Sequence, residues 1–154
     1  MGRFADVVND RLRDGLAERR PRFEWTREYG IAGTPVDVGG VAPDHLVAVE
    51  LEWRRADPAD NAAKLFRHIH EGRVDRRVTV CQVFTRHYHL ASGGVSSKRA
   101  NAEFVGRVAA RTLSDLSYHA VEFDLDPPKR GADRPPEWTD AADTVVGRIA
   151  SLVG

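Results

Sequence analysis

The sequence predicts an α/β fold: one domain whose mixed β-sheet is flanked by helices on both sides. Its 154 residues match the size of a single ordinary domain. The hydrophobic periodicity changes along the chain in the order α-β-β-β-α-β-α-β-α. Three strands gather before the first helical crossover, and later strands alternate with helices, which is typical of sheets with antiparallel and parallel neighbours. Because no internal repeat is evident, residues 1–154 are expected to form one domain.

The first half of the chain predicts a helix followed by three strands. An apolar stripe within residues 4–20 predicts the helix, and Pro21 ends it. The strands are expected over residues 22–29, 34–41 and 45–53, where apolar and polar side chains alternate. Glycines at 30 and 33 turn the chain between the first two strands, and a short segment containing Pro43 joins the second to the third.

The second half alternates helices with strands. Asp57 is expected to cap a helix whose first residue is Pro58, and Gly72 is expected to stop it. A β-rich run at 77–84 predicts an interior strand. The remaining elements expected are a helix capped by Ser97 and reaching Leu113, a strand over 118–124, a Pro-rich excursion over 126–138 and a final helix capped by Thr139.

Composition excludes some classes of protein. The chain has 23 basic and 23 acidic residues, so its net charge of zero does not advertise a nucleic-acid-binding protein, although local clusters of charge still permit one. Its one cysteine, Cys81, allows no internal disulfide, which fits a reducing cytoplasm. No signal peptide and no segment long and apolar enough to cross a membrane are expected.

Three acidic residues on two neighbouring strands form the main candidate site. Glu50 and Glu52 are two positions apart on one predicted strand, so their side chains share a face, opposite to Val49 and Leu51. If Asp37 faces the same way on the preceding strand, three carboxylates converge. Such a cluster repels itself unless a cation neutralises it, and hard divalent cations prefer oxygen ligands.

This arrangement resembles the PD-(D/E)xK nuclease superfamily, whose core has the element order αβββαβ. Its first acid corresponds to Asp37 and its second to Glu50. Its third position is usually lysine but is Glu52 here, a variant similar to the Glu-x-Glu pattern of restriction endonucleases of the BamHI and BglII type. The resemblance spans roughly residues 25–84 and implies a restriction-endonuclease-like fold and a metal-dependent nuclease that cuts DNA, with RNA as a second substrate class.

The resemblance implies a role for each acid. Asp37, Glu50 and the main-chain carbonyl group of Leu51 are expected to bind Mg²⁺, with Mn²⁺ as a substitute. Glu52 is expected to bind a second ion, orient the attacking water or accept its proton. Since the lysine is lost, a nearby cation such as Lys64 on the following helix is a candidate catalytic residue. Glu18, near the end of the first helix, is a second candidate.

Residues that would contact nucleic acid are expected at the strand ends and at a helix start. Arg54 and Arg55 follow the acidic strand, and Lys98 and Arg99 lie near a helix N-terminus, where main-chain amides also favour anions. Asn61 lies one turn before Lys64 and is expected over the end of the same strand. Since enzymes that cut both strands often pair two sites by two-fold symmetry, a homodimer is expected.

Two alternatives are left open by the sequence. Glu52 in place of lysine allows an inactive member of the same fold that serves as a nucleic-acid-binding or assembly subunit. Alternatively, Glu50 and Glu52 form only the solvated face of a half-buried strand in a small protein-interaction domain.

Overall fold

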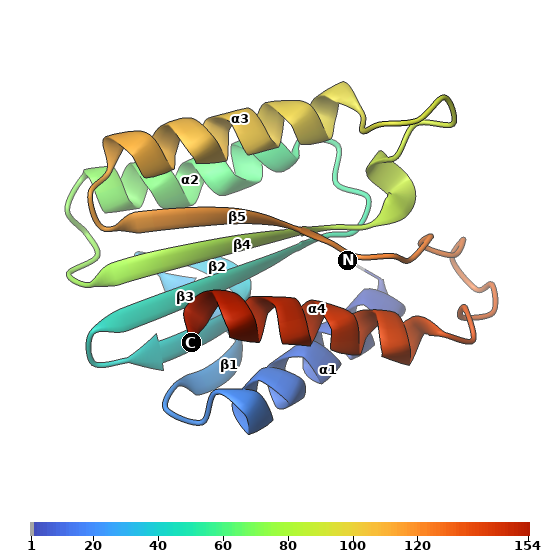
Figure 1. Cartoon of the computed structure of the whole chain (residues 1–154), viewed down its shortest axis with the longest axis horizontal. Coiled ribbons are helices and arrows are strands. Elements are labelled where there is room, and N and C mark those ends of the chain that lie inside the picture. Colours follow the sequence, from blue (N-terminus) through green and yellow to red (C-terminus); the bar gives the residue numbers. More distant parts are fainter. Residues whose placement is uncertain (1) are drawn as a thin grey trace.

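A computed structural model describes residues 2–154, and it has the predicted order of elements (Figure 1). The helices are α1 (Arg3–Arg19), α2 (Pro58–His70), α3 (Ser97–Thr112) and α4 (Trp138–Val153), with a short 3₁₀ helix at Arg86–Tyr88. The strands are β1 (Glu24–Ile31), β2 (Thr34–Ala42), β3 (His45–Glu52), β4 (Arg77–Phe84) and β5 (Leu116–Glu122).

The five strands form one mixed sheet in the order β1-β2-β3-β4-β5. β1, β2 and β3 are antiparallel neighbours, whereas β3, β4 and β5 run parallel. The hairpin between β2 and β3 closes at the pair Ala42 and His45, so Pro43 and Asp44 form its turn. The predicted mixed sheet is therefore confirmed, and β3 lies at its centre.

Helices cover both faces of the sheet, with α1 and α4 on one face and α2 and α3 on the other (Figure 1). The side chains of β3 alternate between these layers. Val47, Val49 and Leu51 pack in the core beneath α1 and α4, and Leu46 and Ala48 pack in the core beneath α2 and α3. Every residue of β3 is buried, because helices cover it on both sides.

Capping chemistry positions α2 over the end of the acidic strand. The Asp57 carboxylate accepts a hydrogen bond from the Asp60 amide at 3.1 Å, and Pro58 occupies the first turn, as predicted. Gly72 adopts a φ of +74° after the helix end, a left-handed conformation that glycine reaches at little cost.

Several predicted boundaries differ from the structure by one or two residues. β1 begins and ends two residues later than predicted, because the tight turn is made by Ala32 and Gly33, both at positive φ. β5 begins two residues earlier, at Leu116, which pairs with Val78. The caps also shift: Ser96, not Ser97, accepts the amide of Arg99, and α4 begins at Trp138 rather than after Thr139.

Within residues 2–154, no helix combines the length and the apolar character needed to cross a lipid bilayer.

Candidate active site

Two carboxylates are buried at the C-terminal end of β3, on the face covered by α2. Glu50 is 3% exposed and Glu52 is 0% exposed. They follow Leu46 and Ala48 on the same face, where apolar side chains would be the ordinary choice. The interpretation of this face as solvated is therefore wrong. Burying two carboxylates is unfavourable unless hydrogen bonds and charges compensate, so their partners define the site.

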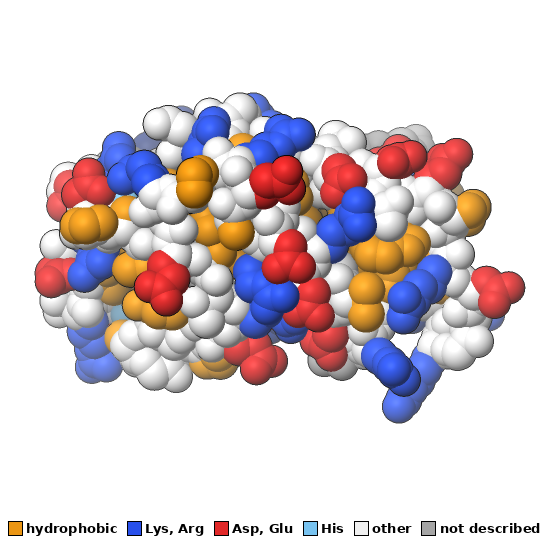
Figure 2. Space-filling view, turned by 90° about the horizontal axis from the view of Figure 1, so that it is seen from below, with side chains coloured by type: hydrophobic (Ala, Val, Ile, Leu, Met, Phe, Trp, Pro, Cys, Tyr) orange, Lys and Arg blue, Asp and Glu red, His pale blue; other side chains and the backbone are white. Residues whose placement is uncertain are grey.

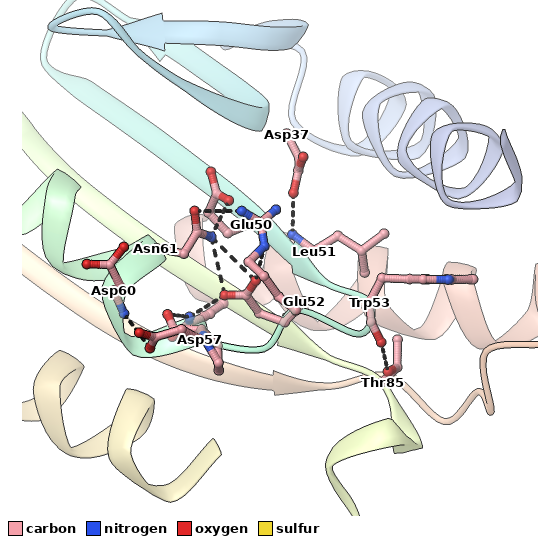
Figure 3. Close-up of polar contacts among 12 residues, drawn as sticks. Asp37, Glu50, Leu51, Glu52, Trp53, Asp57, Asp60, Asn61 and Thr85 are labelled. Carbon is pink, nitrogen blue, oxygen red and sulfur yellow. Dashed lines mark hydrogen bonds and ion pairs between the residues drawn. The ribbon is translucent and has the colours of Figure 1, made fainter. Parts of the chain in front are cut away.

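Asp37 approaches this strand because β2 diverges from β3. The ladder between the two strands ends at the pair Val38 and Val49, so the amide of Leu51 has no partner on β2. The Asp37 carboxylate takes that place and accepts a hydrogen bond from the Leu51 amide at 2.7 Å (Figure 3). Asp37 therefore contacts β3 between Glu50 and Glu52, with one carboxylate oxygen bound to the main chain.

Amide side chains from α2 and β4 hold the two glutamates. Asn61 donates to Glu50 at 2.8 Å and lies 3.3 Å from Glu52 (Figure 3). Gln82 donates to Glu52 at 2.5 Å and to the Pro58 carbonyl group at 2.8 Å. Asn61 was predicted to contact nucleic acid, but its amide group is instead bound within the carboxylate cluster.

Arg55 is the cation of the site. Its Nε lies 3.2 Å from Glu52, and its Nη1 donates to Asn61 at 2.8 Å. Lys64 was expected here, but its side chain is exposed and its ammonium lies 3.7 Å from Asp60 on the same helix. The helix turns Asn61 towards the carboxylates and Lys64 towards solvent, so the structure does not bring Lys64 into the cluster. The positive charge comes from the segment directly after β3.

The environment raises the pKa of all three acids. Burial raises the pKa of Glu50 from 4.5 to about 8, and the charge of Asp37 adds to this effect. Burial also raises the pKa of Asp37, although the Leu51 amide and the charges of Arg55 and Arg27 oppose the rise. Burial is also the main cause that raises the pKa of Glu52, and the contacts with Gln82, Arg55 and Asn61 lower it again in part. In the folded protein, burial therefore favours the protonated form of these acids over the charged form.

The donors fit a hard divalent ion at Asp37 and Glu50, and less well at Glu52. Within residues 2–154, no three Asp, Glu, His or Cys side chains gather into one ligand group, so the expected convergence of Asp37, Glu50 and Glu52 on one ion is wrong. Mg²⁺ is commonly held by one or two carboxylates together with waters and substrate phosphates, so two acids and the Leu51 carbonyl group suffice. Glu52 is already bound by Gln82, Asn61 and Arg55, which makes it a positioning residue rather than a ligand.

Glu18 does not belong to this cluster. At the start of α1, Phe4 packs edge-on against Trp53, just beyond β3, with ring centroids 5.3 Å apart. After the end of α1, Arg20 accepts a hydrogen bond from Trp25, which lies across the sheet from the start of β3. Glu18 is exposed near that far end, so the direction of the helix does not bring it to the acidic cluster.

The polar residue that α1 buries is Asn9, not Glu18. It is 0% exposed, and neither polar atom of its side chain has a partner among residues 2–154. The flanking Asp6 and Asp10 bind Arg27, whose Nε lies 3.3 Å from the Asp37 carbonyl oxygen. An asparagine within the apolar stripe of α1 was the sequence signal for this position.

The predicted basic residues have different roles. Arg99 is only 7% exposed and pairs with Glu103 and Glu122 while stacking over Phe84, so it is an internal ion-pair residue and not a nucleic-acid contact. Arg54 donates to the carbonyl groups of Pro127 and Pro128. Lys98 is exposed at the start of α3 and makes no ion pair with the described residues.

Gln82 and Tyr118 were missed by the sequence reasoning. The Tyr118 hydroxyl donates to the Gln82 carbonyl oxygen at 2.6 Å and thereby orients the Gln82 amide towards Glu52. The signal was a polar residue inside the apolar run of β4, in register with Glu50. That register is a tertiary property, so the pairing could not be read from the sequence.

No family model matches this chain, and no curated protein matches it either.

Proposed function

We propose that the protein is a metal-dependent nuclease with a restriction-endonuclease-like fold of the PD-(D/E)xK type. The observation that carries the proposal is the pair Asp37 and Glu50 at the point where β2 leaves β3. The order αβββαβ supports it, as does the pKa of Glu50, which burial and the charge of Asp37 raise to about 8. Strongly shifted pKa values occur more often at functional sites than elsewhere, which supports a functional role for Glu50.

The chain's residues divide the work of phosphodiester hydrolysis. Asp37, Glu50 and the Leu51 carbonyl group would hold Mg²⁺ or Mn²⁺. The bound ion supplies acidification of a water molecule and neutralisation of charge on the phosphate. Arg55 supplies a fixed positive charge, the function expected of the missing lysine. Glu52, Asn61 and Gln82 fix the positions of Arg55 and Glu50.

DNA is the substrate class of this proposal, and endonucleolytic cleavage is the reaction. A homodimer would bring two such sites to the two strands of a duplex. The reducing interior of a cell suits a chain whose one cysteine is free and buried.

A second function is favoured by Glu52. Its carboxylate is fully engaged by neighbours, and a lysine at this position would supply the charge that the chain instead takes from Arg55. An inactive subunit that binds nucleic acid would keep such a network for stability alone. That protein would bind DNA without hydrolysing it and would need no divalent ion.

The test is incubation with supercoiled plasmid, single-stranded DNA and RNA in Mg²⁺, Mn²⁺ or EDTA. Wild-type protein is expected to cut DNA only with a divalent ion. Glu50→Gln is expected to lose most of this activity, because a ligand to the ion is removed. Lys64→Gln, a substitution at an exposed residue outside the cluster, is the matched control and should keep wild-type activity. Intact DNA in every lane would support the inactive subunit.

A further inference from the structure

A basic pocket of about 930 Å³ opens beside the acidic cluster, at the end of the molecule where the Pro-rich loop meets the N-terminus. Six cationic residues line it: Arg3, Arg54, Arg55, Lys129, Arg130 and Arg134. No acidic residue among residues 2–154 does so. Since the whole chain is neutral, this local excess of positive charge is a property of the fold.

Most of this charge is available to a ligand. Arg3, Lys129, Arg130 and Arg134 form no ion pair with any of residues 2–154, whereas many other arginines of the chain are paired with acids. Lys129 and Arg130 are exposed on the loop. Arg134 lies over the ring of Phe4, 5.0 Å from its centroid. The charges therefore remain unneutralised without an anionic partner.

The wall of the pocket is held in place. Arg54 donates to the carbonyl oxygens of Pro127 and Pro128, the latter at 2.6 Å, and so ties the loop to the segment after β3. Prolines at 127, 128, 135 and 136 restrict the loop backbone further. Phe4 and Trp53 form an aromatic floor. Seen from below, hydrophobic side chains at this end lie among Lys and Arg side chains (Figure 2).

The pocket is connected to the candidate catalytic residues. Leu51 lines it, and the amide of Leu51 binds Asp37. Arg55 also lines it and pairs with Glu52 at 3.2 Å. Leu51 packs on the α1 and α4 face of β3, opposite to Glu50 and Glu52. None of the three acids lines the pocket, so Arg55 is the residue that joins a bound ligand to the acidic cluster.

We propose that this pocket binds the phosphodiester backbone of the DNA strand next to Arg55, the residue that joins the pocket to the acidic cluster. The inference rests on the proposed nuclease function and adds to it Arg3, Lys129, Arg130 and Arg134 as the phosphate-binding residues. Several unpaired cations around one pocket favour the phosphate groups of a nucleic acid over a neutral ligand.

The experiment measures the binding of a short fluorescein-labelled oligodeoxynucleotide, as single strand and as duplex, by anisotropy in EDTA. Lys129→Ala/Arg130→Ala is compared with Arg107→Ala/Arg111→Ala, which removes two exposed, unpaired charges from the distal half of α3. The pocket variant is expected to raise Kd about tenfold and to reduce the slope of log K against log[salt] by about 1 to 2. The α3 variant should bind like the wild type.

Equal weakening by both variants, unchanged binding by the pocket variant, or no salt-dependent binding by the wild type would overturn the inference. The experiment is separable from the test of nuclease activity because it contains no divalent ion. Binding that depends on the pocket, without cleavage in Mg²⁺ or Mn²⁺, would keep the inference and reject the nuclease. If the protein cleaves DNA but the Lys129→Ala/Arg130→Ala variant binds DNA like the wild type, the nuclease function would be kept and the pocket inference rejected.

Discussion

Glu50 links the stability of the fold to the proposed ion site. Its carboxylate lies on the buried face of β3, where an apolar side chain would be the ordinary choice. Burial, together with the negative charge of Asp37, raises the pKa of this carboxylate to about 8. An unfolded chain would hold the same group near 4.5. The folded protein therefore bears a free-energy penalty at neutral pH that a bound cation would remove.

The pH dependence of stability follows from that shift. Between pH 4.5 and about 8, the folded protein keeps a proton on Glu50 that the unfolded chain has lost, so the free energy of unfolding falls as pH rises. One pKa unit corresponds to about 1.4 kcal/mol, which makes the total fall at most ~5 kcal/mol. Urea denaturation of the metal-free protein across this window should show it.

The control for the pH experiment is a pair of glutamine variants. Glu50→Gln should flatten the profile, whereas Glu24→Gln, at an exposed position on β1, should preserve its slope. Parallel profiles for the wild type and Glu50→Gln would show that the pKa of Glu50 is not raised in the folded state.

How far the site could be predicted from sequence differs from residue to residue. Glu50 and Glu52 were placed on one face by strand periodicity alone, and the hairpin brought Asp37 beside them. The identity of the cation was not predictable, because the rotation of α2 sends Lys64 into solvent. The role of Gln82 could not be predicted for a different reason, because only the parallel register of β3 and β4 brings it beside Glu50.

At the scale of elements, the packing of α3 on β5 holds the site. Gly106 on α3 lies against the ring of Tyr118, where an added Cβ would meet ring carbons at 2.4 to 2.5 Å. Tyr118 in turn orients Gln82, and Gln82 holds Glu52. Elements were predictable because their periodicities are strong, whereas their ends depended on tertiary contacts such as the pairing of Leu116 with Val78.

Gly106→Ala should therefore destabilise the protein, although alanine has the higher helix propensity. Overpacking against Tyr118 is expected to cost about 1 to 3 kcal/mol, more than the ~1 kcal/mol that alanine contributes in a helix. In α4, Gly147→Ala meets only the flexible end of Arg19 at 3.1 Å and should be neutral or stabilising. Urea denaturation compares the two, and a Gly106→Ala protein as stable as the wild type would contradict this packing.

At the scale of the whole molecule, the chain has no net charge, but its positive charges are not evenly distributed over the fold. Ion pairs neutralise many arginines on the helices, while four cations that form no ion pair with residues 2–154 lie around the pocket beside the Pro-rich loop: Arg3, Lys129, Arg130 and Arg134. The fold class was predictable from the order of elements, but this distribution was not, because it depends on which arginines meet an acid in space. Arg99, expected at the surface, is buried by two such pairs.

The oligomeric state belongs to the same scale. Cleavage of both strands by one active site per chain is best served by two chains related by a two-fold axis. Sedimentation equilibrium in the presence of duplex DNA and EDTA should therefore give two copies of the 17.1 kDa chain per duplex. One copy per duplex at every protein concentration would instead indicate an enzyme that nicks single strands.

The most direct test of the central claim, that Asp37 and Glu50 form a divalent-ion site, is calorimetric titration of the protein with Mn²⁺. We predict one strong site per chain in the wild type, lost in both Asp37→Asn and Glu50→Gln and retained in the Glu24→Gln control. Loss of binding should be accompanied by loss of the rise in Tm that Mn²⁺ gives the wild type. Undiminished Mn²⁺ binding by the Asp37 and Glu50 variants would contradict the account.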